Sequence, residues 1–181
     1  MNDYRTLISA TLLACLSTGC GGGGGGGGGN AAADDATTVK GALTFALQHA
    51  ANPKEWIFDD YRAGLEGYDN WIAALSEGKA SDMGTRYNTG VWLECRQCAV
   101  GFLEEAQARL AGRADGFFAE ALDAYRIVAE SLGQVAELYP WSHEADDEEV
   151  LPVDDRSRAA VEALQAARAA EAAALETLPK I

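Results

Sequence analysis

Cys95 and Cys98, two of the four cysteines of this chain, form a Cys-x-x-Cys motif, the arrangement in the sequence that most resembles a chemical site. Such a pair supports disulfide exchange when it begins a helix, and binds zinc when two further soft ligands are near. It attaches haem when a histidine follows, but here Ala99 follows Cys98, which excludes that chemistry. The other possibilities depend on the element that carries the motif.

The motif lies within a segment of helical periodicity that runs from Thr85 to Leu110. Apolar side chains recur there at steps of three and four and predict one buried face, made of Tyr87, Val91, Cys95, Cys98, Phe102, Ala106 and Leu110. The cysteines are therefore about three turns inside a helix, away from the N-terminal dipole that lowers a thiol pKa. Side chains three apart on a helix have Cβ atoms about 5–6 Å apart, too far for an undistorted disulfide.

We expect Cys95 and Cys98 to be two buried thiols that fill core volume. The alternatives are a disulfide with local distortion, which an exported protein would permit, and a thiol-dependent redox or metal-binding role. Zinc would need more ligands than the sequence offers nearby, because His49 and His143 are far apart.

A second candidate site comes from the aromatic residues, which include four Trp and six Tyr. Two predicted helices that we expect to face each other supply the residues of a possible ligand cleft: Tyr68, Trp71, Tyr87, Asn88 and Trp92. Aromatic rings with a few polar groups can line a binding cleft, and they can equally fill a bundle core. Both interpretations stay open.

Other familiar patterns do not point to chemistry. The acidic run over residues 144–149 lacks the spaced ligands and glycine of a calcium loop and reads as a solvated loop. No Gly-x-Ser-x-Gly nucleophile motif occurs, and the glycine run lacks the Lys-Ser/Thr ending of a phosphate loop. We therefore expect no catalytic residue, no metal ion and no cofactor.

The remaining periodicity predicts four more helices, over residues 37–51, 60–77, 117–139 and 152–178. Thr37 or Thr38 is the expected cap of the first. Gly64 and Gly67 lie inside the second at a cost of about 1 kcal/mol each, which indicates a close neighbour or a frayed first turn. Strand-favouring runs are nearly absent, so the sequence predicts an all-α antiparallel bundle of four to five helices over residues 38–181.

The charge balance excludes some classes of binding partner. The net charge is −14, and the 14 Lys and Arg form no cluster, so the field repels nucleic acid. The same field opposes adsorption to anionic lipid headgroups, so attachment to a membrane would need an anchor.

The N-terminus has the features of such an anchor. An apolar stretch of about ten residues, too short to span a bilayer, follows Arg5 and ends at Gly19-Cys20, which resembles a bacterial lipobox. We expect residues 1–19 to be a lipoprotein signal peptide, Cys20 to carry the lipid, such as palmitate, and residues 20–37 to form a glycine-rich tether. Cys15, after Leu-Leu-Ala, is the second candidate for lipidation.

A further resemblance lies in apolar and aromatic residues spread over the middle of the chain: Gly64-Leu65-x-x-Tyr68-x-x-Trp71-Ile72-x-x-Leu75, Tyr87-Asn88 and Ala99-x-x-Phe102-Leu103. Over residues 42–140 they resemble the C-terminal helical region of proteins related to butirosin biosynthesis protein H. In those proteins the acyl-transfer or peptidase-like chemistry belongs to a papain-like N-terminal half, where this chain has its leader and glycine run. The resemblance implies a helical accessory or binding module without the catalytic Cys and His.

Together these features predict an exported lipoprotein of the bacterial cell envelope, anchored to the outer or cytoplasmic membrane and facing the periplasm or the exterior. We expect a module that binds a small molecule, a peptide or a partner protein rather than an enzyme. The alternative function is the thiol-dependent redox or metal-binding role of Cys95 and Cys98.

Overall fold

The computed structural model describes residues 34–58, 61–146 and 148–181. The predicted signal peptide, the glycine run, Cys15 and Cys20 lie outside these ranges. Five α-helices and two short 3-10 helices account for most of the described chain: α1 (Asp35–Ala51), η1 (Pro53–Glu55), α2 (Gly64–Ser76), α3 (Asp82–Arg109), α4 (Asp115–Leu138), α5 (Asp155–Thr177) and η2 (Leu178–Lys180). In the described ranges the only β pairing is an isolated bridge between Ser81 and Val150. The predicted all-α antiparallel bundle is confirmed.

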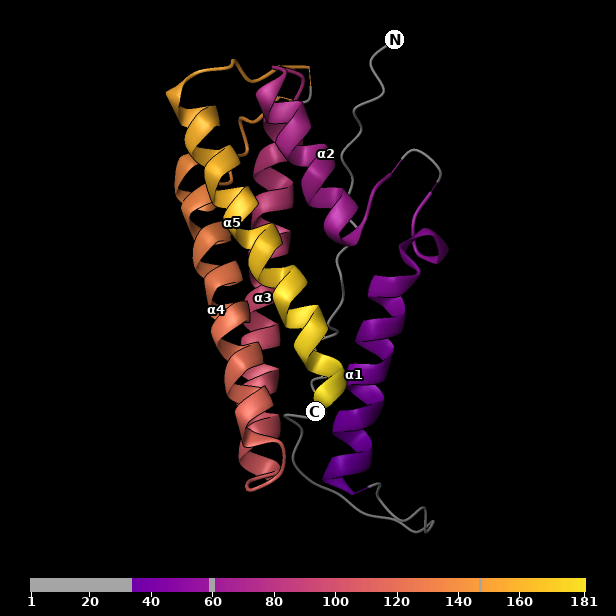
Figure 1. Ribbon diagram of the computed structural model, residues 1–181. Coiled ribbons are helices and arrows are strands. Elements are labelled where there is room, and N and C mark those ends of the chain that lie inside the picture. Colours follow the sequence, from indigo (N-terminus) through magenta and orange to yellow (C-terminus); the bar gives the residue numbers. More distant parts are fainter. Residues whose placement is uncertain (1–33, 59–60, 147) are drawn as a thin grey trace, which may run out of the picture.

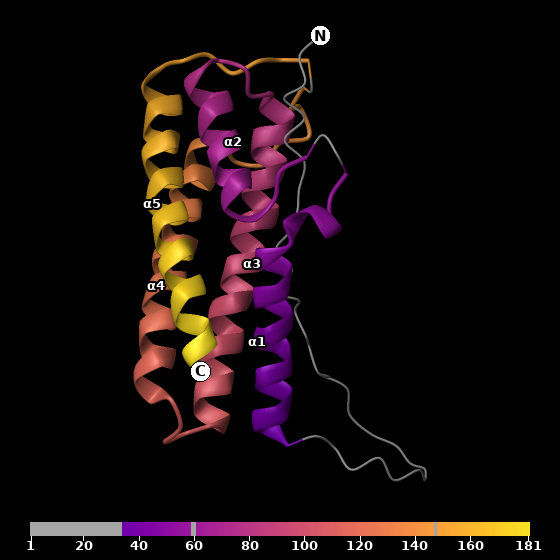
Figure 2. The ribbon, with the colours of Figure 1, turned by 45° about the vertical axis from the view of Figure 1, so that its right-hand side comes forward.

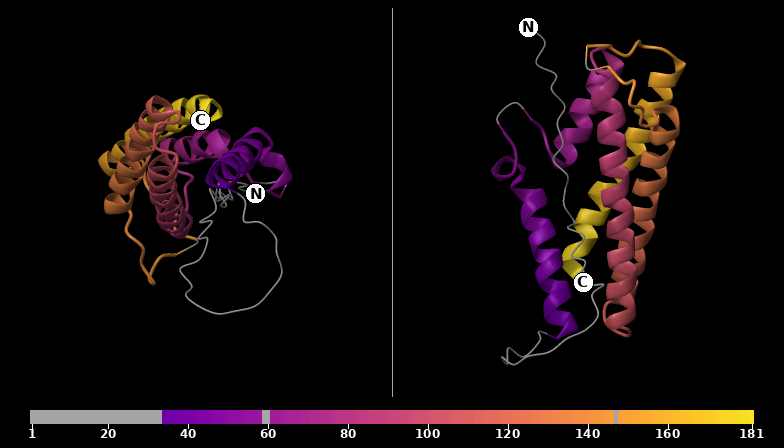
Figure 3. Two further views of the ribbon diagram at one scale, coloured as in Figure 1. Left: turned by 90° about the horizontal axis from the view of Figure 1, so that it is seen from below. Right: turned by 180° about the vertical axis from the view of Figure 1, so that it is seen from behind.

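Three long helices form the body of the bundle. Figure 1 shows α3, α4 and α5 side by side and alternating in direction, and the view from behind in Figure 3 shows α3 spanning the full length of the molecule. The two shorter helices share the remaining side. Helix α2 covers the end where α3 begins, and α1 covers the other end, with the connector between them at mid-height (Figure 2).

Side-chain caps set where the helices begin. The Asp34 carboxylate accepts a hydrogen bond from the Thr37 backbone N–H at 3.0 Å, so Asp34 caps α1 in place of the expected Thr37 or Thr38. Ser81 caps α3 by accepting from the Gly84 N–H at 3.1 Å, which starts this helix three residues before the predicted Thr85. An acceptor before the first turn satisfies an N–H that has no partner within the helix.

The inward face of α3 differs from the predicted one. Tyr87 is exposed, and Val91, Cys95, Cys98, Phe102 and Leu110 are only half-buried. The buried line lies mostly one residue further on: Asp82, Thr85, Asn88, Thr89, Trp92, Arg96, Ala99, Leu103 and Ala106. The prediction failed because it followed apolar residues alone, whereas half of this face is polar and its Arg96 pairs with Glu171 on α5.

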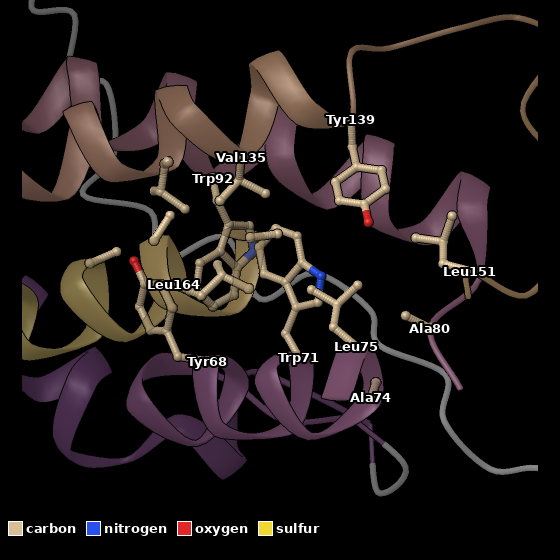
Figure 4. Packing of buried hydrophobic residues seen from close by; sticks show 14 of the residues in the cluster. Tyr68, Trp71, Ala74, Leu75, Ala80, Trp92, Val135, Tyr139, Leu151 and Leu164 are labelled. Carbon is tan, nitrogen blue, oxygen red and sulfur yellow. The ribbon is translucent and has the colours of Figure 1, made fainter. Parts of the chain in front are cut away.

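The interior consists of two apolar cores. The first core lies between α2, α5 and the adjoining halves of α3 and α4, and includes Tyr68, Trp71, Trp92, Val135 and Leu164 (Figure 4). The second core packs α1 and the end of α5 against the other halves of α3 and α4, and includes Val39, Leu43, Leu103, Phe118 and Leu178. Each of the two shorter helices therefore covers its own core: α2 covers the first and α1 the second.

Gly67 marks the closest approach between α2 and α3. A Cβ atom at this position would lie 2.9 Å from the Trp92 ring atom Cη2 and 3.2 Å from the Arg62 carbonyl oxygen. The first distance is too short for a side-chain contact, and the indole has buried neighbours on its other side. Of the two predicted reasons for glycine here, a close neighbour is confirmed.

We expect Gly67→Ala to lower the free energy of unfolding by about 1–3 kcal/mol, because the added methyl group overpacks the contact with Trp92. The matched control is Gly101→Ala on α3, an exposed helical position where a Cβ meets nothing within 4 Å. The control should gain up to about 1 kcal/mol from helix propensity. Urea unfolding of both variants measures the difference, and equal gains would contradict the steric argument.

Candidate functional site

The structure brings four of the five predicted cleft residues together in the interior. Tyr68 and Trp92 meet edge to face with ring centroids 4.6 Å apart, and Trp71 lies 5.9 Å from Trp92. Asn88, one turn before Trp92 on α3, is also buried. Figure 4 shows the three rings interleaved with aliphatic side chains of the first core. The fifth residue, Tyr87, is 42% exposed and does not join them.

Tyr87 belongs instead to a surface group. Its ring centroid lies 6.0 Å from that of Trp141, in the loop between α4 and α5, and Trp141 in turn lies 6.1 Å from His143. The five predicted residues thus divide between the interior and this separate exposed group.

A buried ion pair lies next to Trp92. On α3, the Arg96 guanidinium donates through Nη2 to the Glu171 carboxylate of α5 at 2.7 Å and through Nε at 3.1 Å. The Tyr68 hydroxyl of α2 donates to the same carboxylate at 2.7 Å. The guanidinium also lies over the Trp92 ring, 4.9 Å from its centroid. We call Arg96, Glu171, Tyr68 and Trp92 the buried polar centre.

Burial and pairing together set the charges of this centre. Burial works against the Arg96 charge, but the adjacent Glu171 carboxylate outweighs it, so the pKa of Arg96 is raised above its usual value. Burial also raises the pKa of the Tyr68 hydroxyl well above 10, and raises that of Tyr125 on α4. At neutral pH the centre therefore holds a charged guanidinium and the protonated phenol of Tyr68, with protonated Tyr125 nearby. These groups suit fixed hydrogen bonding better than proton transfer.

Three N–H groups at and beside the centre are buried without a hydrogen-bond acceptor in the described part of the chain. They belong to Arg96 Nη1, Trp92 Nε1 and Trp71 Nε1. A buried donor without an acceptor costs about 1–3 kcal/mol, more when it is charged. All three groups are donors only, so the chemistry that would suit them is an acceptor oxygen.

His49 approaches the centre from α1. Its side chain is buried near the end of that helix, with its ring 4.9 Å from the Trp56 ring. Burial, assisted by the positive charge of Arg96, lowers the pKa of His49 below 6.5. The imidazole is therefore neutral at pH 7.

Cys95 and Cys98 lie on either side of Arg96 along α3, and both are half-buried. Neither forms a disulfide in the described structure. Across the described ranges, no three His, Cys, Asp or Glu side chains gather as metal ligands.

Sequence reasoning missed Glu171 and did not anticipate that Arg96 is buried. A signal was present on α5, where Glu171 falls in register with the buried Ala163, Ala167 and Ala174. A charged residue on a buried helical register needs a partner of opposite charge, and Arg96 is the cation that α3 supplies.

No protein-family model, no curated protein and no solved structure matches this chain. The resemblance to relatives of butirosin biosynthesis protein H stays a prediction. Function is therefore inferred from the residues of this chain alone.

We expect Arg96→Met to cost about 3–5 kcal/mol of folding stability, because it leaves the Glu171 carboxylate buried without its cation. The double variant Arg96→Met with Glu171→Met should recover most of that loss, since it removes both charges. Urea unfolding of the natural chain, both single variants and the double variant measures these changes in stability. The exposed pair between Arg168 and Asp69, at 2.6 Å, joins α5 to α2 and is the control, with Arg168→Met costing at most about 1 kcal/mol. Strictly additive losses at Arg96 and Glu171 would contradict the coupling.

We expect His49 to make the fold sensitive to mild acid. Its pKa is lower in the folded state, so the unfolded chain binds the extra proton and stability falls as the pH drops below about 6.5. His49→Asn should lose less stability between pH 7.5 and 5.5 than the natural chain. The exposed His143→Asn is the control and should behave like the natural chain. Thermal unfolding at the two pH values gives the comparison, and identical acid losses in the His49 variant would exclude this role.

Proposed function

We propose that this chain is a lipid-anchored helical-bundle lipoprotein of the bacterial cell envelope that acts as a binding or accessory module. The observation that carries the proposal is the sequence around Cys20, where a short apolar stretch ends at Gly19-Cys20 and a run of nine glycines follows. The described bundle begins soon afterwards, at Asp34. This order of leader, anchor, spacer and folded domain fits a protein held at a membrane surface.

The described helices are compatible with attachment through a lipid. Among the residues that the structure describes, no helix is long and apolar enough to cross a bilayer. The bundle instead has a strongly acidic exterior, which gains nothing from anionic headgroups. A lipid on Cys20 would supply the attachment that this surface does not.

The buried polar centre supports binding or accessory work over catalysis. The Glu171 carboxylate accepts hydrogen bonds from both Arg96 and Tyr68, and the raised pKa of Tyr68 keeps its phenol protonated. A general base needs a free acceptor, whereas both Glu171 oxygens already accept hydrogen bonds from Arg96 or Tyr68. A proton donor needs a pKa near the working pH, and that of the Tyr68 phenol is too high. The exterior, with exposed Trp56, Phe58 and Trp141, supplies apolar contact area for a partner.

We expect Cys20→Ala to release the protein from the membrane fraction of a bacterial host, because the lipidated thiol is gone. The natural chain should stay with the membranes in high salt and leave them in detergent. Cys15→Ala is the matched control and should behave like the natural chain. Immunoblots of the fractions and the mass of the processed N-terminus measure the outcome. Membrane retention of a processed Cys20→Ala chain would count against the proposal, and release by Cys15→Ala would move the anchor there.

A further inference from the structure

The end of α1 and the connector after it carry an exposed aromatic surface. Phe45, Trp56 and Phe58 are 38%, 50% and 80% exposed, and we call them the aromatic edge. Phe45 and Trp56 meet edge to face with centroids 5.6 Å apart. Trp56 also lies against the buried His49, which fixes the indole to the end of α1. Contacts with Phe45 and His49 therefore hold Trp56 in place, while the rings of the aromatic edge remain exposed to solvent.

The sequence around the aromatic edge is acidic, like the rest of the chain. Residues 34–60 contain two lysines, Lys40 and Lys54, against five acids, Asp34, Asp35, Glu55, Asp59 and Asp60, a formal charge of −3. Attraction to anionic headgroups therefore does not draw the edge to a membrane, and its contact with a bilayer must come from the three aromatic rings.

The N-terminal chain is long enough to let this face reach a bilayer. Asp34 follows Cys20 by 14 residues, which span at most about 50 Å when extended. The 17 residues of α1 rise about 25 Å from that point to the aromatic edge. A protein held at Cys20 can therefore bring the edge to the membrane that holds it.

We propose that the aromatic edge inserts into the interfacial layer of the bilayer to which the lipid anchor holds the protein. The proposal rests on the lipoprotein function, since the anchor supplies the local concentration that a small apolar patch needs. Trp and Phe suit this layer because their rings are apolar, and the indole N–H of Trp can still reach a headgroup oxygen.

Trp141 provides a matched comparison for Trp56. It is 53% exposed, against 50% for Trp56, but it lies in the loop between α4 and α5, outside the aromatic edge. The other two tryptophans, Trp71 and Trp92, are buried and should respond to neither solvent nor lipid. Fluorescence from the chain therefore reports on two exposed indoles that belong to different segments of the chain.

The experiment imposes attachment independently of lipidation. The chain from Gly21 onward, with a hexahistidine tag before it, is bound to phosphatidylcholine vesicles that contain a nickel-chelating lipid. Attached protein is recovered by flotation, and tryptophan fluorescence is compared between vesicles with brominated and ordinary acyl chains. The natural chain is measured beside Trp56→Phe and Trp141→Phe, with circular dichroism as the check on folding. Because the tag replaces the lipid, failure here is distinct from failure of the Cys20 anchor.

Brominated lipid should quench the natural chain and Trp141→Phe, and at least three-quarters of that quenching should disappear in Trp56→Phe. Phe58→Ser should reduce the quenching at least twofold. Ile127→Ser, which also replaces an exposed apolar side chain by serine but on α4, should not. Quenching that survives Trp56→Phe would overturn the proposal and place another face on the membrane. No quenching of floated protein would also overturn it, and would leave the edge as a surface for a protein partner.

Discussion

The ion pair between Arg96 and Glu171 is the interaction on which the interior of this bundle depends. It lies between the two apolar cores: on α3, Trp92 belongs to the first core and Ala99 to the second, and on α5, Ala167 and Ala174 divide in the same way. Both charges are almost fully buried, so neither is tolerable without the other. A shift of α3 along α5 by one turn would separate them, and the pair therefore fixes the register of α3 relative to α5.

The third partner extends this constraint to α2. Tyr68 donates to Glu171, while Gly67 beside it lets the Trp92 indole reach the backbone of α2. One layer of side chains thus ties α2, α3 and α5 together, and Tyr125 brings α4 close to the same carboxylate. The cost of burying a charged group is offset by its hydrogen bonds and by the cation over the Trp92 ring.

Helix α1 is less deeply packed into the core than the other four described helices. It buries a single narrow stripe of Val39, Leu43, Ala46 and His49, and its outer side ends in the aromatic edge. It is also the first described helix after the proposed anchor. An element with little core contact can carry contacts to a membrane without straining the rest of the bundle, because the register of α2 to α5 is set without it.

The sequence by itself determined the helices and their order, because apolar residues at steps of three and four can bury only one face of a helix, and turn residues end each run. For Gly67 it offered two reasons, a close neighbour or a frayed first turn, and the structure chose the first. What only the tertiary structure decided was which face of α3 turns inward. Arg96 is polar by type, and its burial depends on a carboxylate 75 residues away that no local pattern connects to it. The same long-range pairing placed Trp92 and Tyr68 in the interior and left Tyr87 on the surface, since the rotation of one helix moves every residue on it together.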